Sequence, residues 1–179
     1  MKKLTKLFLV VVVMAGISVS AAAQTPKFAH INSQELIFLM PEYDSVMVKM
    51  EAFGKELQEQ IEGMQKELQD KYAIYQQKNA TWTAGVAEAK LKELNDLGQR
   101  AEEFRQTAQQ DFQKQQQELM SPVIEKAKKT IAVVAKRENF LYVFDLSAGS
   151  LAYFDEQQST DLLPLVKKEL KITKELPRR

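Results

Sequence analysis

The chain has 179 residues, a formal net charge of +1, six glycines, five prolines and no cysteine. The lack of cysteine excludes a disulfide framework and a lipid-anchored N-terminus, and the few glycines and prolines disfavour an all-β or a disordered chain. Removal of the three lysines of a predicted N-terminal signal from the 25 Lys and Arg leaves 22 against 24 Asp and Glu. Because nucleic-acid-binding proteins carry a clustered basic excess, no nucleic-acid partner is expected.

The N-terminus has the three regions of a secretory signal peptide. A basic segment that ends at Lys6 precedes the apolar run Leu7–Ile17, and the small residues Ala21–Ala23 follow. The apolar run is too short to cross a bilayer comfortably, which disfavours the alternative of a transmembrane anchor. We predict that residues 1–23 are removed by cleavage before Gln24 and that the mature chain lies in the periplasm.

A short strand is predicted from Lys27 to Ile31. Phe28 and His30 would lie on one face of it and Ala29 and Ile31 on the other, because side chains alternate along a strand. His30 is the only histidine, and there is no cysteine to share a metal with it. We therefore interpret His30 as a packing or surface residue and predict no metal site.

A short helix is expected directly after this strand. Asn32 or Ser33 can cap its first turn, and Asn32 followed by Glu35 resembles a capping box. The helix is predicted over 34–39 and should stop before Pro41, because proline disfavours helical backbone in the residue that precedes it.

Two long apolar stripes with helical spacing dominate the centre of the chain. The first stripe consists of Val46, Met50, Phe53, Leu57, Ile61, Met64, Leu68, Tyr72 and Tyr75. The second stripe consists of Leu94, Leu97, Ala101, Phe104, Ala108, Phe112, Leu119, Val123, Ala127, Ile131 and Val134. Residues 79–85 interrupt the pattern and predict a tip between two helices.

Helices of this length extend for roughly 50 to 75 Å, which is too long for a single compact core. They are expected to project as an antiparallel hairpin whose two stripes face each other. Pro122 lies inside the second helix and removes a backbone hydrogen bond, so a kink is predicted there. Pro122 is therefore the candidate hinge at the base of this arm.

The periodicity changes to that of strands at Asn139. Residues 140–144 and 151–154 are predicted to form a β-hairpin around a turn at 147–149. Thr160 or Asp161 would cap a last helix over 162–171, with Pro164 in its first turn. Three short strands are not stable alone, so copies of the chain are expected to join through this head. The predicted fold class is mainly α with a small β head.

The two ends of the chain resemble the Skp/OmpH family of periplasmic chaperones, and specifically its Bacteroidetes-type members. The resemblance is carried by Phe28–Glu35, Met40–Tyr43, Tyr142–Ser147 and Leu151–Phe154. It implies a homotrimer with a small β-barrel-like head and three helical hairpins around a cavity. It also implies that unfolded outer-membrane β-barrel proteins are bound there without ATP.

The resemblance divides the mature chain into a head, residues 24–42 and 119–179, and an arm, residues 43–118. Acidic and basic residues are nearly balanced between Tyr43 and Asn139. No lipopolysaccharide site is therefore carried over, and contact with a membrane surface is not indicated.

Two groups of side chains are candidate sites. The candidate client contacts near the end of the arm are Met64, Tyr72, Tyr75 and Trp82, for which packing within the helix pair and the tip is the alternative. The residues assigned to the oligomerisation head are Phe28, Ile31, Tyr142, Phe144, Leu151 and Tyr153, of which the last four are also interpreted as head core.

No catalytic residue or cofactor is predicted. The sequence has no glycine-rich phosphate loop and no nucleophile elbow, and Glu102 and Glu103 are interpreted as solvated residues on a helix flank. The predicted function is an ATP-independent holdase, not an enzyme, that prevents aggregation of outer-membrane proteins before assembly. The alternative is a coiled-coil structural or interaction protein of the cell envelope.

Overall fold

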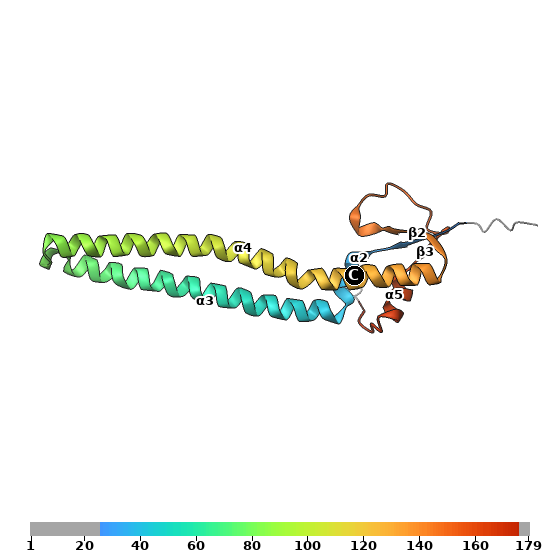
Figure 1. Ribbon diagram of the computed structural model, residues 1–179, viewed down its shortest axis with the longest axis horizontal. Helices are drawn as coiled ribbons and strands as arrows, with labels where there is room; N and C mark the ends of the chain where they lie inside the picture. The colour runs from blue at the N-terminus through green and yellow to red at the C-terminus, as the bar shows by residue number, and fades with distance from the viewer. Residues whose placement is uncertain (1–25, 176–179) are drawn as a thin grey trace, which may run out of the picture.

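The computed structural model describes residues 26–175. The predicted signal peptide and the predicted cleavage before Gln24 lie outside these residues. Figure 1 shows a head of short elements at one end, from which a single pair of long helices projects.

The arm consists of α3 (Pro41–Lys78), the 3-10 turn η1 (Asn79–Thr81) and α4 (Ala84–Arg137). With 38 and 54 residues, the two helices span roughly 57 and 81 Å. The predicted antiparallel hairpin and its tip are confirmed. Because α4 is much longer than α3, it continues from the arm into the head (Figure 1), and the predicted division at 118/119 falls within this continuous helix.

The second apolar stripe lies in the interior as predicted, since all of its members are buried or half-buried. The first stripe is buried at its base, where Val46 and Met50 are 6% and 3% exposed, but Tyr72 near the end is 52% exposed. The seam between the helices therefore becomes less complete toward the tip.

The head contains an open sheet of three strands within the described residues: β1 (Lys27–Ile31), β2 (Phe140–Asp145) and β3 (Ser159–Asp161). Their order is β2-β1-β3, and both pairs are parallel. The predicted β-hairpin of residues 140–144 and 151–154 is therefore wrong, because 151–154 is not a strand and β3 comes later in the chain. The sheet that residues 26–175 form is not closed into a barrel.

The reason for this difference lies at the end of β2. The Asp145 carboxylate accepts a hydrogen bond from the Ser147 backbone N–H at 3.0 Å, and Leu146–Ala148 form the 3-10 turn η2. Gly149 follows with a φ of 62°, which is left-handed backbone that glycine adopts without strain. The predicted turn is therefore present, but the chain then arches over the sheet before β3 pairs with the other edge of β1 (Figure 1).

Two short helices complete the head. The helix α2 spans Ser33–Leu39, and the side chain of Asn32 accepts a hydrogen bond from the Glu35 N–H at 3.1 Å. Of the two predicted caps, Asn32 and Ser33, Asn32 is therefore the one that caps this helix. The helix α5 (Leu163–Glu169) is shorter than predicted, with Pro164 in its first turn. The Asp161 carboxylate accepts a hydrogen bond from the Leu163 N–H at 2.9 Å.

The core of the head lies between one face of the sheet and the helices. Ala29 and Ile31 on β1 pack with Leu36, Val134 and Val166, and all five are at most 1% exposed. The predicted alternation of faces along β1 is confirmed. Burial of these aliphatic side chains is the main stabilising contribution to the head.

Candidate functional site

An aromatic cluster covers the face of the sheet that is turned away from the helices. The ring centroids of Phe28 and Tyr142 lie 6.4 Å apart in stacked geometry, and Phe144 lies 6.4 Å from Phe28 and 6.2 Å from Tyr142. We name these three residues the head aromatic face. Tyr142 is 58% exposed, whereas Phe28 and Phe144 are half-buried, so this face leaves one aromatic ring largely in contact with solvent.

Two head-core predictions are corrected by these positions. Ile31, a predicted residue of the oligomerisation head, is 1% exposed and is a core residue of the single chain. Tyr142 and Tyr153 are not head core, because their exposed fractions are 58% and 83%. Phe144 and Leu151 are half-buried. The alternation of side chains along β1 places Ile31 and Phe28 on opposite faces of the sheet.

His30 lies at the edge of the head aromatic face. Its Nδ1 is 2.8 Å from the Ser159 hydroxyl on β3, and its ring lies 4.8 Å from that of Phe154 in the loop above. His30 therefore packs the loop and β3 against β1, in agreement with its predicted structural role.

Asp145 joins the end of β2 to the start of α2. Its carboxylate accepts hydrogen bonds from the Ser33 N–H at 3.1 Å and the Ser33 hydroxyl at 2.5 Å, and also from the Ser147 N–H and hydroxyl. Partial burial alone would raise the pKa of Asp145, but the bonds from Ser33 and Ser147 outweigh it, and the pKa is lowered. Asp145 thus stays ionised and fixes the geometry of the head.

The candidate client residues lie in the distal half of the arm. Tyr75 and Trp82 are half-buried and meet edge to face at 6.0 Å, so they pack the tip. Met64 is half-buried and Tyr72 is exposed. The arrangement brings Tyr75 and Trp82 together and leaves Tyr72 free to contact another molecule.

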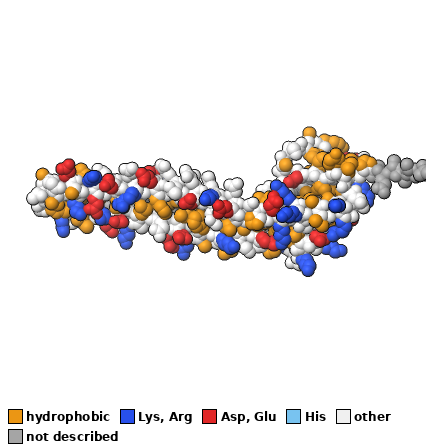
Figure 2. Space-filling view, viewed as in Figure 1, with side chains coloured by type: hydrophobic (Ala, Val, Ile, Leu, Met, Phe, Trp, Pro, Cys, Tyr) orange, Lys and Arg blue, Asp and Glu red, His pale blue; other side chains and the backbone are white. Residues whose placement is uncertain are grey.

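Sequence reasoning missed three further apolar side chains on this part of the arm. Ile74, Val86 and Leu91 are 49%, 44% and 44% exposed, although none of them belongs to a stripe. Their positions outside the periodic pattern are the signal that identifies them, because an apolar residue on a polar helix face has no partner in the pair. Figure 2 shows hydrophobic side chains along the arm between charged ones.

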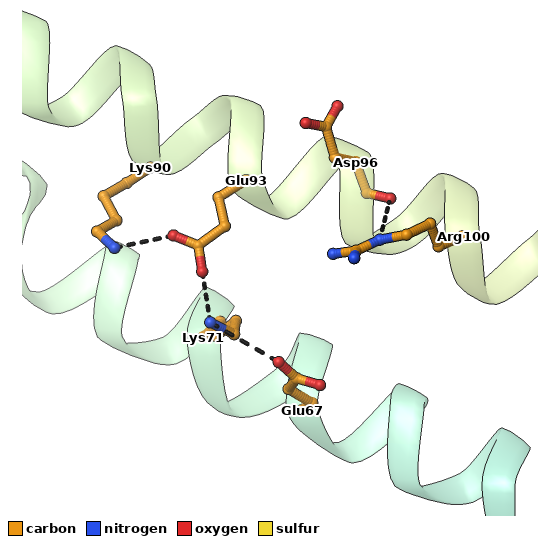
Figure 3. A network of polar contacts seen from close by, with 6 residues as sticks. All are labelled: Glu67, Lys71, Lys90, Glu93, Asp96 and Arg100. Atoms are coloured by element: carbon orange, nitrogen blue, oxygen red, sulfur yellow. Dashed lines mark hydrogen bonds and ion pairs between the residues drawn. The ribbon is translucent and has the colours of Figure 1, made fainter.

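An ion-pair cluster links the two helices near the same place (Figure 3). Lys71 Nζ on α3 lies 2.5 Å from Glu93 Oε1 on α4, and Lys90 Nζ lies 2.8 Å from Glu93 Oε2. The hydrogen bond from Lys71, with that from Lys90, lowers the pKa of Glu93 to about 2. Glu67 also pairs with Lys71 at 3.7 Å. The cluster bridges α3 and α4 at this level.

The base of the arm has ion pairs of its own. Glu42 in the first turn of α3 pairs with Lys126 on α4, and the hydrogen bond from Lys126 lowers the pKa of Glu42. Lys174 binds Asp44 at 2.6 Å. Pro122 is exposed one turn of α4 away from Lys126, and α4 is continuous through it.

Residues 26–175 contain no cluster of three or more His, Cys, Asp or Glu side chains arranged to hold a metal. Within the same residues, no helix combines the length and the low charge that are needed to span a bilayer.

The geometry defines a class of protein in which one long helical hairpin projects from a small parallel sheet with an exposed aromatic face. Residues 27–170 match the model of the family described as outer membrane protein (OmpH-like). The chain therefore belongs to the OmpH-like family.

Two relatives agree with this assignment. The chaperone protein Skp of Yersinia enterocolitica is 27% identical over 155 residues, which cover 85% of this chain and 93% of that protein. The crystal structure of an OmpH-like protein from Caulobacter crescentus CB15 superposes with a TM-score of 0.70 at 15% identity, over 87% of this chain and 90% of that one. The latter likeness shows the shared fold.

Proposed function

We propose that this protein is an ATP-independent periplasmic holdase that binds unfolded outer-membrane β-barrel proteins and prevents their aggregation before membrane assembly. The observation that carries the proposal is the distal arm, where Tyr72, Ile74 and Leu91 are 44–52% exposed on helices that project away from the head. Membership of the OmpH-like family and similarity to a protein named as a chaperone support it.

The chemistry of such a client fits this surface. Strands of an outer-membrane barrel alternate apolar and polar side chains, so the unfolded chain exposes many weak apolar segments. Several shallow contacts can retain such a chain through high effective concentration, while each contact dissociates quickly. Binding of the unfolded state alone requires no ATP, because it only shifts the client's equilibrium away from aggregation.

The proposed assembly is a homotrimer joined through the head. Tyr142 of the head aromatic face is exposed in the single chain, and β2 and β3 are the edge strands of its sheet. Contact between copies would cover both the ring and the strand edges. The number of three is implied by the resemblance to Skp/OmpH chaperones. Three arms around one cavity would provide the multiple contacts that retention requires.

Aggregation of several urea-denatured outer-membrane barrels after dilution tests the holdase proposal. We expect the purified mature protein to suppress light scattering for all of them at stoichiometric amounts and without ATP. Suppression for none, together with stable binding of one folded envelope protein, would favour the alternative of a structural coiled-coil protein.

The assembly is tested by light scattering for mass. Tyr142→Ser removes an aromatic ring from the head aromatic face and should shift the protein toward monomer. Leu141→Ser on the same strand is the matched control, because Leu141 is similarly exposed at 60% but lies outside the aromatic cluster. Equal masses for both variants and the wild type at low micromolar concentration would rule out this interface.

We also propose that Pro122 is a hinge at the base of the arm. A proline inside α4 lacks one backbone N–H and therefore weakens the helix where it leaves the head. Pro122→Ala should narrow the distribution of arm openings in small-angle scattering. An unchanged distribution would remove Pro122 from the mechanism.

A further inference from the structure

We propose that a neutral groove on the distal arm binds an extended, uncharged client segment that presents apolar side chains at alternate positions. The proposal rests on the holdase function proposed above and specifies which part of the client this surface recognises. Its occupant is a strand-like segment of a barrel protein, not another copy of this chain.

The groove lies between α3 and α4 and has a volume of about 480 Å³. Leu68 from α3 and Leu94 from α4 line its inner part, while Tyr72 and Leu91 stand at its exposed edge. Leu94 is 7% exposed and belongs to the seam of the hairpin. The groove is therefore an opening into the apolar seam and offers an apolar side chain a site that is shielded from water on several sides.

Gly98 on α4 creates the space. A Cβ atom at this position would meet only Leu68 Cδ2, at 3.9 Å, which is ordinary van der Waals distance. The helix therefore does not require glycine here, and a glycine inside a helix is less favourable than alanine. What the glycine provides is a hollow that any larger side chain would fill.

The polar part of the groove is made of uncharged amides. The amide side chains of Gln69, Asn95 and Gln99 line it, and no Lys, Arg, Asp or Glu is among the described residues that do. Amides both donate and accept hydrogen bonds, so they can pair with the N–H and C=O groups of an extended backbone. A charged client side chain would lose water here without gaining an opposite charge.

A charged surface lies directly beside the neutral groove, so the groove can select among client segments by their charge. The adjacent pocket on the hairpin, which contains the Lys71–Glu93–Lys90 cluster, is charged and shares Leu94 with the groove. The arm thus carries a charged and a neutral surface at the same level. The charged pocket also has the apolar lining residues Ile74, Tyr75 and Trp82, but only the neutral groove lets an apolar segment bind without the desolvation of a charge.

The spacing of the groove also fits a strand. Leu94, which is an apolar wall of the groove, and Gly98, which leaves its hollow, lie four residues apart on α4, and this corresponds to a rise of about 6 Å. Side chains on one face of an extended strand repeat every ~6.6 to 6.8 Å. Successive apolar residues of an alternating segment can therefore meet successive turns of α4, and membrane-spanning strands have this alternation.

The test measures fluorescence anisotropy of a labelled ten-residue peptide with alternating Val or Tyr and Ser or Thr. Gly98→Leu fills the groove and should raise the Kd by at least about tenfold. Gly63→Leu is the matched control, because a Cβ at Gly63 meets nothing within 4 Å and Gly63 does not line the groove. Leu91→Gln is a second variant that removes one wall and should also weaken binding. A peptide with Lys at the apolar positions should bind the wild type at least about tenfold more weakly.

If Gly98→Leu, Gly63→Leu and the wild type bind the peptide with equal affinity, the proposal that this groove binds the client segment is wrong. If the wild type still suppresses barrel aggregation in that case, the holdase function stands and only the groove is lost. If the wild type neither binds the peptide nor suppresses aggregation, the proposed holdase function is wrong, and the groove proposal that rests on it is wrong as well. If Gly98→Leu changes the mass of the assembly and not the peptide affinity, a copy of the chain occupies the groove and the proposal is wrong.

Discussion

The head and the arm of this protein are stabilised in different ways. The head buries complete aliphatic side chains between a sheet and helices, and Ile31, Leu36, Leu162 and Val166 have at most 1% exposure. The distal arm buries one narrow seam, in which Leu94 and Leu97 retain 7% and 4% exposure while large apolar residues beside them stay exposed. A core of the first kind specifies a rigid base, whereas a seam of the second kind leaves surface for binding.

Stability and binding are therefore separated along the chain, with stability in the head and binding surface on the distal arm. Substitutions in the head should act mainly on folding, because its interior is closed. Substitutions on the distal arm should act mainly on binding, because the same side chains that could bind a client contribute little to the fold.

The largest effect on the free energy of unfolding is expected for Leu36→Ala in α2. Leu36 is fully buried in the head core, so its truncation should lower the free energy of unfolding by about 2–5 kcal/mol. Leu91→Ala on the arm should change it by less than about 0.5 kcal/mol, because Leu91 is 44% exposed. Urea unfolding followed by circular dichroism measures both. Equal losses would contradict the division between head and arm.

The next effect is expected for Asp145→Ala, which leaves the donors of Ser33 and Ser147 without their acceptor. The loss should be about 1–3 kcal/mol at neutral pH. Because the folded pKa of Asp145 is lowered, its contribution is complete above the unfolded pKa of roughly 3.9 and is lost as the pH falls through the folded value.

The difference in stability between wild type and Asp145→Ala should therefore shrink in acid, as thermal melts between neutral and strongly acidic pH would show. A difference that stays constant over this range would contradict the role of the carboxylate.

A smaller effect separates two glycines. Gly149 has a φ of 62° in the head, so Gly149→Ala should cost about 1 kcal/mol. Gly85 lies in the first turn of α4, where a Cβ meets nothing within 4 Å, and Gly85→Ala should be neutral or slightly stabilising. A lower melting temperature for Gly149→Ala, together with an unchanged or higher one for Gly85→Ala, would support the left-handed turn after β2. Equal shifts in melting temperature would contradict it.

The smallest effect is expected for Glu93→Gln, which breaks an exposed ion-pair cluster on the arm. Because the pKa of Glu93 is lowered to about 2, the pair contributes fully above roughly pH 4.3 and is lost as the pH falls toward 2. The change should be confined to faster hydrogen exchange at the tip at low salt and should vanish at high salt. Glu88→Gln, at an exposed position of the same helix, should change nothing.

The sequence by itself determined the order and type of most elements, because their signals are local. The spacing of apolar residues predicted α3 and α4, the run 79–85 predicted the tip, and Asn32 with Pro41 set the limits of α2. The apolar alternation of β1 also separated Phe28 and His30 from Ala29 and Ile31.

Only the tertiary structure decided which strands pair and which apolar side chains remain exposed. The run 151–154 has strand composition, yet β3 is formed by Ser159–Asp161, because pairing with β1 depends on where the chain arrives after crossing the sheet. Likewise, the hollow at Gly98 exists only because Leu68 from a distant part of the chain leaves it open. Such contacts join residues that are far apart in sequence, and local periodicity carries no information about them.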